Sequence, residues 1–198
     1  LAVLWGLGIL RLRRRKVATA AVLGVGVICL GWLCLPGRTV DRTVLRQTYV
    51  QCLKEYEGSL YFWGGENRIG IDCSGLVRRG LINANARLGL LTLNPRLVRT
   101  ALSLWWHDCS ARALRDEHRG YTLRLSTADS INDADHSTIE LGDLAVTSDG
   151  VHVLAYIGDA KWIAADPDAR RVIIEDVPSE SMWFCRSVEL IRWRQLVE

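Results

Sequence analysis

An uncharged run of nineteen residues, Val17–Leu35, constrains the fold of this chain more than any other feature. It reads VATAAVLGVGVICLGWLCL, and a helix of this length, rising about 1.5 Å per residue, matches the hydrocarbon thickness of a bilayer. The run is apolar on all sides. It lacks the polar stripe of a helix that packs one face on a core and exposes the other to water. We therefore predict that residues 17–35 form one transmembrane helix.

The flanks of this run set its orientation. A basic segment, RLRRRK at residues 11–16, precedes it, and the positive-inside rule keeps such a segment in the cytoplasm. The remainder of the chain is then expected outside the cytoplasm. A cleaved signal peptide is the alternative, but WLCLPGR offers no small-x-small cleavage site, which favours an uncleaved anchor. Residues 1–10 are also apolar, and the sequence leaves open whether they are the tail of an earlier spanning helix.

Charge and cysteine usage narrow the function classes. Residues 36–198 carry 20 Lys/Arg against 22 Asp/Glu, so the region beyond the anchor has no basic footprint for nucleic acid. The six cysteines include no CxxC pair, and we predict no metal site and no cofactor. Cys52 and Cys109 are expected to be buried structural thiols.

Helices are predicted in the first half of the region beyond the anchor. A helix is expected over Asp41–Glu57, capped by Asp41 and ended by Gly58, and a short extended piece over Leu60–Trp63. A second helix is expected to start at Asp72 or Cys73 and to run through residues 76–82, with residues 83–95 as a connection. A third helix is expected from the Asn94-Pro95 start, fading near Gly120. Its predicted apolar face consists of Val98, Ala101, Leu102, Trp105, Trp106 and Cys109.

Strands are predicted after a polar, loop-like stretch at residues 126–140. The segments LGDLAVT and VHVLAYI flank Ser148-Asp149-Gly150, a hairpin turn signal, and KWIAA, RVIIEDV and SVELIRW follow as further strands. Helices therefore come first and an antiparallel sheet second. This order favours an α+β fold over a parallel α/β fold.

Cys73 is the first candidate for chemistry. It follows a glycine-rich turn and stands at the expected start of a helix, where the helix dipole and free backbone N–H groups favour a thiolate. The same N–H groups can stabilise an oxyanion beside the sulfur. A buried, inert cysteine near a helix start is the structural alternative.

A thiol nucleophile needs a base, and His152 is the best placed of the four histidines. It begins the strand VHVLAYI after a tight turn, and alternation puts it on one face with Leu154 and Tyr156. A third polar residue usually orients such a histidine, and Asp166 on the next strand is the nearest acceptor. An aspartate in a turn before Pro167 is an equally good interpretation of Asp166.

The segment YFWGGENRIGIDCSGLV resembles the nucleophile region of the NlpC-type cysteine peptidases, papain-like enzymes that cut bacterial cell-wall peptides. The matching positions are Tyr61, Trp63, Gly64, Gly65, Asp72, Cys73, Ser74 and Gly75. LGDLAVT resembles the Gly-Asp-Leu strand of the family, and GVHVLAYIGDAKWI its histidine strand and hairpin. The resemblance covers roughly residues 41–195 and is specific because all of these motifs occur together.

The resemblance implies a papain-like fold, in which N-terminal helices pack on an antiparallel sheet. It implies that Cys73 and His152 are catalytic, that the Tyr61 hydroxyl is a second oxyanion donor, and that Asp72 and Ser74 help to bind the free amine of a peptidoglycan stem peptide. The expected scissile bond joins D-glutamate to the diamino acid. The expected location is the bacterial inner membrane, with a single-pass anchor.

The chain departs from the family pattern in two places. Many members carry a third catalytic residue, a histidine, where this chain has Ala164, so Asp166, another residue or a backbone group must orient His152. In addition, 79 positions separate Cys73 from His152, which exceeds the usual spacing. The extra material is the segment 83–140, which is expected to form a wall or lid of the substrate cleft.

Together these features predict two parts. Residues 1–37 form the anchor with its basic cytoplasmic segment, and residues 38–198 form an NlpC-type catalytic domain with an atypical insertion at 83–140. The predicted activity is that of a cysteine peptidase acting through a Cys-His thioester mechanism. A degenerate module that binds cell-wall peptides without cutting them is one alternative, and a related Cys-His amidase or acyltransferase is another.

Overall fold

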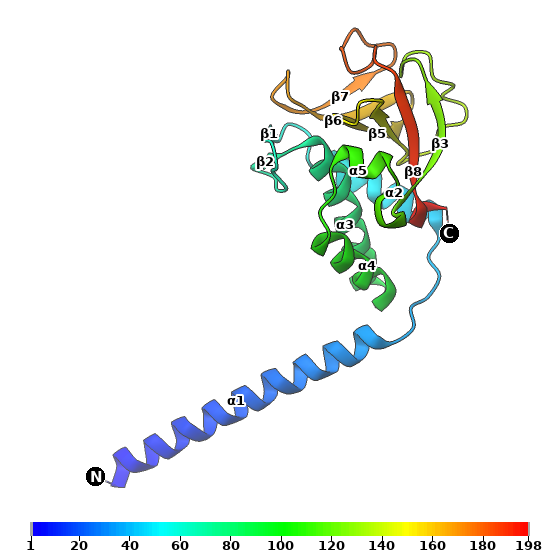
Figure 1. Cartoon of the computed structure of the whole chain (residues 1–198). Helices are drawn as coiled ribbons and strands as arrows, with labels where there is room; N and C mark the ends of the chain where they lie inside the picture. The colour runs from blue at the N-terminus through cyan, green and yellow to red at the C-terminus, as the bar shows by residue number, and fades with distance from the viewer. Residues whose placement is uncertain (1, 198) are drawn as a thin grey trace.

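The N-terminal helix stands apart from the rest of the chain in the computed structural model, which describes residues 2–197, with side chains from residue 14 on (Figure 1). Helix α1 spans Ala2–Cys34. Its segment Arg14–Cys34 is long and apolar enough to cross a membrane, and none of its most apolar window is buried. The helix therefore includes the apolar run of residues 17–34 and also the basic segment before it.

The rest of the chain folds into helices followed by strands. The helices are α2 Arg42–Lys54, α3 Cys73–Leu91, α4 Pro95–Trp106, α5 Ala111–Arg115 and the 3-10 turns His118–Gly120 and Arg194–Leu196. The strands are β1 Leu60–Tyr61, β2 Gly70–Ile71, β3 Thr122–Ala128, β4 Leu144–Thr147, β5 Val153–Gly158, β6 Lys161–Asp166, β7 Arg171–Asp176 and β8 Val188–Trp193. Each strand predicted after residue 140 is present.

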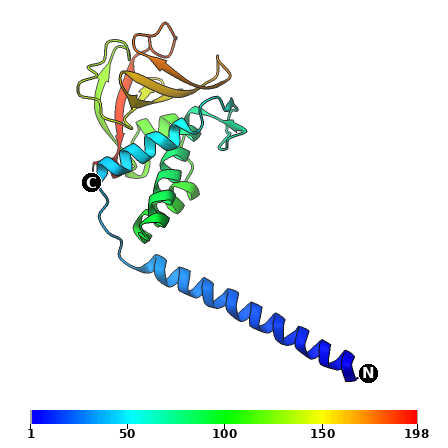
Figure 2. The ribbon, with the colours of Figure 1, turned by 180° about the vertical axis from the view of Figure 1, so that it is seen from behind.

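The strands form one sheet in the order β2-β1-β7-β6-β5-β4-β8-β3. All of its pairings are antiparallel except that of β1 with β2. Viewed from behind, the helices lie together below the sheet (Figure 2). The α+β architecture expected from the order of the elements is confirmed.

Two apolar cores lie on opposite faces of the sheet. The first fills the space between the sheet and helices α2 and α3, and it takes alternate β5 residues such as Val153 and Ala155. The second lies on the other face, where Leu154 and Tyr156 meet Trp183 and Phe184. Successive residues of β5 thus point to opposite faces of the sheet, and Cys73 packs on the face that carries Val153 and Ala155.

The prediction of a connection at residues 83–95 is wrong for residues 83–91, where α3 continues. Asn85 tolerates a buried position because its amide donates to Leu81 O at 2.9 Å and to Gln195 Oε1 at 3.0 Å. Gly89 lets α4 approach closely, since a Cβ there would lie 2.7 Å from the Val98 side chain. These tertiary contacts override the polar, glycine-containing local sequence.

The predicted apolar face of α4 is confirmed for Ala101 and wrong for Leu102, Trp105 and Trp106, which are exposed. The buried side of the helix consists of Pro95, Leu97, Ala101 and Leu104. Trp105 and Trp106 are instead 52 % and 75 % exposed, and Cys109, although buried, lies beyond the end of the helix. The loop predicted at residues 126–140 begins only after β3, which pairs with β8.

Candidate active site

Cys73 is the first residue of α3, and Asp72 caps that helix. One oxygen of the Asp72 carboxylate accepts hydrogen bonds from Gly75 N at 2.6 Å and from Ser74 Oγ at 3.0 Å. The other oxygen accepts from Gly64 N at 2.8 Å. Asp72 therefore ties the glycine-rich turn to the start of the helix and fixes the position of the cysteine between them.

The glycines of this motif allow two backbone segments to touch. A Cβ on Gly75 would lie 2.5 Å from Gly65 O, and a Cβ on Gly65 would lie 2.5 Å from Gly70 O. Any side chain at either position would push the turn away from the helix. The pattern Gly-Gly…Asp-Cys-Ser-Gly is thus explained by close packing around the cysteine.

A cavity of about 350 Å³ opens at Cys73. Its lining residues are Tyr61, Trp63, Gly64, Glu66, Asp72, Cys73, Ser74, Gly75, Asp108, Ser110, Ala111, Gly150 and Val151. Three of them are acidic; Glu66 and Asp108 are ion-paired with buried Arg78, whereas the Asp72 carboxylate accepts hydrogen bonds from neutral groups. Asp108, Ser110 and Ala111 belong to the segment 83–140, which therefore forms part of the cavity wall.

The thiol of Cys73 is buried, with 7 % of the residue exposed. Burial, and next the negative charge of Asp72, raise its pKa to about 11. The backbone N–H groups of Val153, Ser74 and Cys73 lower this pKa, as a helix N-terminus is expected to do, but they are outweighed. The sulfur is consequently a neutral thiol at neutral pH in this structure.

The imidazole of His152 is packed on an indole. The residue is 2 % exposed, and its ring stacks on Trp183 with centroids 4.2 Å apart and an interplanar angle of 26°. Burial, and next the positive charge of Arg186, lower the pKa of His152 to about 4. The Arg186 guanidinium lies 5.1 Å from the centroid of the Trp183 ring. It also forms an ion pair with Asp149 at 3.0 Å.

Cys73 contacts the backbone on both sides of His152, just before and at the start of β5. The Cys73 sulfur lies 3.9 Å from Val151 O, and the Val153 N–H is directed at it, so the sulfur touches the chain on both sides of His152. Among the described residues no hydrogen bond joins the sulfur to the imidazole, and His152 Nε2 is buried without a partner. The structure brings the two residues into one neighbourhood and leaves the proton-transfer contact unmade.

Asp166, the residue predicted to orient His152, stabilises the turn that follows β6. Its Oδ1 accepts hydrogen bonds from Asp168 N at 2.6 Å and from Ala169 N at 2.8 Å, and no bond to His152 is present in the described part of the chain. Ala164, where the family pattern has histidine, lies in the second core together with Trp183. The Ala164 side chain is only a methyl group, so it provides no hydrogen-bond acceptor for His152 Nε2.

Tyr61 and Ser74 both lie at the cavity that contains Cys73. Burial, and next the nearby Cys73, Asp72 and Asp166 groups, raise the pKa of the Tyr61 hydroxyl, which keeps it a hydrogen-bond donor at neutral pH. The hydroxyl of Ser74 is used internally, since it donates to Asp72.

Two side chains that the sequence reasoning passed over shape the site. Arg78, 1 % exposed, forms ion pairs with Glu66 and with Asp108, the latter at 3.2 Å, and donates to Leu104 O at 2.8 Å. It thus joins the glycine-rich turn to the atypical segment across the cavity wall. The pair of arginines in the apolar stretch LVRRGLI was a signal for it, whereas nothing local in the sequence pointed to Trp183.

Comparisons with known proteins find one family profile and several solved structures that are similar to this chain. The sequence profile of the NlpC/P60 family matches residues 58–192. NlpC1 from Trichomonas vaginalis is 19 % identical, with a TM-score of 0.50, over 79 % of this chain and 46 % of its own. The NlpC/p60 domain of the peptidoglycan hydrolase SagA is 20 % identical, with a TM-score of 0.43, over 77 % of this chain and 98 % of its own.

A third solved structure extends over more of the chain. The peptidoglycan hydrolase RipB from Mycobacterium tuberculosis is 20 % identical, with a TM-score of 0.42, over 88 % of this chain and 82 % of its own. No curated protein matches the chain. The chain spans less than half the length of NlpC1, and the region matched by the family profile includes Cys73, His152 and Asp166.

Proposed function

Since this chain belongs to the NlpC/P60 family, we propose that it is a membrane-anchored cysteine peptidase that hydrolyses amide bonds in peptidoglycan stem peptides. The observation that carries the proposal is the position of Cys73. This residue begins a helix, faces an acid-lined cavity and is held there by an aspartate cap and close-packed glycines. The family profile covers all of these residues.

In the proposed reaction Cys73 attacks the amide carbonyl and forms a thioester, which water then hydrolyses. The backbone N–H of Cys73 and the Tyr61 hydroxyl donate to the oxyanion. His152 takes the thiol proton and delivers it to the leaving amine. The resting ring is neutral, so it can accept a proton, and it is held in a stack on Trp183.

The carboxylate of Asp72 supports a substrate with a free amine. Glu66 and Asp108 are balanced by Arg78, so Asp72 is the lining carboxylate proposed to bind the amine, and a stem peptide bound there would place its first amide bonds near the sulfur of the next residue, Cys73. This is the proposed reason for cleavage between D-glutamate and the diamino acid. The proposed location is the bacterial inner membrane, with α1 as a single-pass anchor and the catalytic domain outside the cytoplasm.

A module that binds cell-wall peptides without cutting them is the second candidate. The unpartnered Nε2 of His152 and the alanine at position 164 favour it, because a catalytic histidine is normally oriented by a polar partner. The neutral thiol of Cys73 favours it as well. An amidase would use the same pair on a different amide, and an acyltransferase would use it with an acyl acceptor other than water.

The full chain in detergent, incubated with purified muropeptides, separates these functions. Cleavage that disappears in Cys73→Ala and persists in Cys185→Ala, which removes an exposed thiol that does not line the cavity, supports the peptidase. Equal cleavage by the parent chain and Cys73→Ala contradicts it. Calorimetric binding of muropeptides without any cleavage identifies the binding module.

A further inference from the structure

Three leucines are exposed together where α3 turns into α4. Leu90, Leu91 and Leu93, here called the leucine turn, are 63 %, 76 % and 72 % exposed. Leu93 also has a φ of 48°, a left-handed backbone conformation that is unfavourable for a branched side chain. Exposed apolar side chains that are grouped together indicate a surface with a partner.

The residues that follow the leucine turn are hydrogen-bonded to the end of α1 and to the linker after it. The Arg99 guanidinium donates to the carbonyls of Leu33 and Leu35, the second at 2.8 Å. Asn94, directly after the turn, accepts from Arg38 N at 3.2 Å and donates to Arg38 O at 2.9 Å. The chain leaving the apolar helix is therefore hydrogen-bonded on both sides of Gly37 to the start of α4.

Gly37 makes this junction tight. A Cβ at this position would lie 2.0 Å from the Arg96 Cβ and 2.6 Å from Asn94 Oδ1, so the linker lies directly on the first turn of α4. Figures 1 and 2 both show the lower end of the α3–α4 pair next to the C-terminal end of α1. The distance between the leucine turn and that helix end is thus set by contacts rather than by a loose linker.

A spanning helix ends at the membrane–water interface, and its junction with the leucine turn places the turn at the same level. We propose that the leucine turn inserts into the outer surface of the membrane that α1 crosses, as a second contact that orients the catalytic domain. This inference rests on α1 being a membrane anchor, which is part of the proposed function. It does not depend on whether Cys73 is catalytic.

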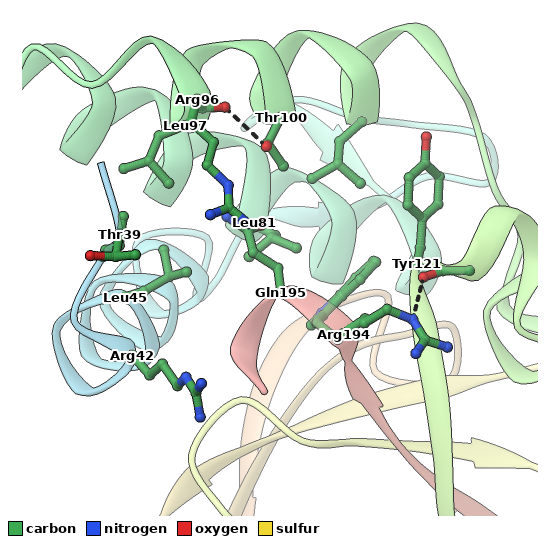
Figure 3. A pocket seen from close by; sticks show the side chains of 14 residues that line it. Thr39, Arg42, Leu45, Leu81, Arg96, Leu97, Thr100, Tyr121, Arg194 and Gln195 are labelled. Carbon is green, nitrogen blue, oxygen red and sulfur yellow. Dashed lines mark hydrogen bonds between the residues drawn. The ribbon is translucent and has the colours of Figure 1, made fainter. Parts of the chain in front are cut away.

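The charge around the leucine turn fits an anionic lipid surface. Arg38, Arg96 and Arg99 are exposed beside it. A cavity of about 250 Å³ adjoins the linker, and Figure 3 shows Arg42, Arg96 and Arg194 around it with the apolar side chains of Leu45, Leu81 and Leu97. Basic side chains flanking exposed leucines are the composition of an interfacial membrane-binding segment.

Site-specific photo-crosslinking in nanodiscs that contain phosphatidylglycerol tests this inference with the full chain. The photoreactive amino acid p-benzoylphenylalanine replaces one exposed leucine at a time: Leu30 in α1, Leu91 in the leucine turn, or Leu125 on β3 at the edge of the sheet. Mass spectrometry then identifies lipid adducts. We expect adducts at positions 30 and 91, and none above background at position 125.

The three positions separate the possible failures. Adducts at position 30 without adducts at position 91 would overturn the leucine turn as a membrane contact while leaving the anchor intact. Adducts at neither position would overturn the anchor and the inference together. Equal adducts at positions 91 and 125 would show nonspecific contact, and a crosslink from position 91 to a second copy of the chain would identify a dimer interface instead.

Discussion

The ring of His152 stacks on the indole of Trp183 with centroids 4.2 Å apart, while the sulfur of Cys73 contacts the backbone on both sides of the same histidine. The base and the nucleophile of the proposed reaction are therefore neighbours in the chain's fold without sharing a proton. The stack is a resting arrangement in which the imidazole and the thiol are both neutral.

The free energy of unfolding should fall as the pH is lowered from the unfolded-state pKa of His152 towards its folded-state pKa. The folded-state pKa is lowered from 6.5 to about 4, so the buried neutral ring stabilises the fold fully above pH 6.5. That contribution, about 3 kcal/mol, is lost as the pH falls from 6.5 towards 4. Urea unfolding of the full chain in detergent at pH 7 and pH 4.5 measures it.

The variant His152→Asn should lose this part of the pH dependence. His118→Asn, which changes an exposed histidine, is the matched control and should keep it. An unfolding free energy of His152→Asn that falls with pH as steeply as that of the parent chain would show that His152 is not buried in its neutral form.

Alkylation of Cys73 should be slow at neutral pH and should accelerate with increasing alkalinity. The folded pKa of about 11 leaves little thiolate at pH 7, and only the thiolate reacts with iodoacetamide. Peptide mapping of labelled protein between pH 6 and pH 10 measures the rate, with exposed Cys185 as the internal reference. Rapid labelling with a plateau below about pH 7 would instead indicate a thiolate–imidazolium pair.

The substitution Gly75→Ala should displace the glycine-rich turn. Its new methyl group would lie 2.5 Å from Gly65 O, and overpacking of this kind costs about 1–3 kcal/mol. We expect a lower free energy of unfolding and slower muropeptide cleavage. Gly31→Ala, where no atom lies within 4 Å of the added Cβ, is the control and should match the parent chain. Full stability of Gly75→Ala would mean that the turn does not press on the helix start.

The buried carboxylate of Asp143 should be a major contributor to stability. It is 0 % exposed and accepts two hydrogen bonds from the Arg192 guanidinium at 2.6 and 2.7 Å. Asp143→Ala removes both of these bonds at a site of low exposure and leaves the guanidinium with the Glu140 carboxylate at 2.9 Å, so we expect a loss of about 3 kcal/mol in the free energy of unfolding.

An exposed ion pair provides the comparison. Asp176→Ala removes the partner of Lys161 at the surface, and a loss below about 1 kcal/mol is expected there. Similar losses for the two variants in thermal or urea unfolding would contradict the importance of the Asp143–Arg192 pair.

Much of the fold was predictable because the signals are local. Asp41 and Asn94 cap the helices that follow them, as predicted, α3 starts at Cys73 as one of the two expected positions, and the strands after residue 140 occur where alternation and turn residues place them. The apolar run at residues 17–35 coincides with the exposed part of α1 except for its last residue.

The errors come from contacts between distant residues. The buried Asn85 is held by Gln195, 110 positions away, and so α3 runs on through a stretch that looks like a loop. Both tryptophans of α4 are exposed while Leu97 and Leu104 are buried, and this choice of face depends on where α3 packs. The stack of His152 on Trp183 depends on a return of the chain 31 positions later, and no pattern around either residue indicates it.

The most direct test of the proposed function is a search for an acyl group on Cys73. The full chain is mixed with a muropeptide, quenched in acid within a single turnover, digested, and analysed by mass spectrometry. A thioester-linked peptide fragment on Cys73, absent when the same experiment is done with Cys73→Ala, is the predicted result. Muropeptide cleavage at the normal rate with no acyl group on Cys73, and undiminished in Cys73→Ala, would contradict the account.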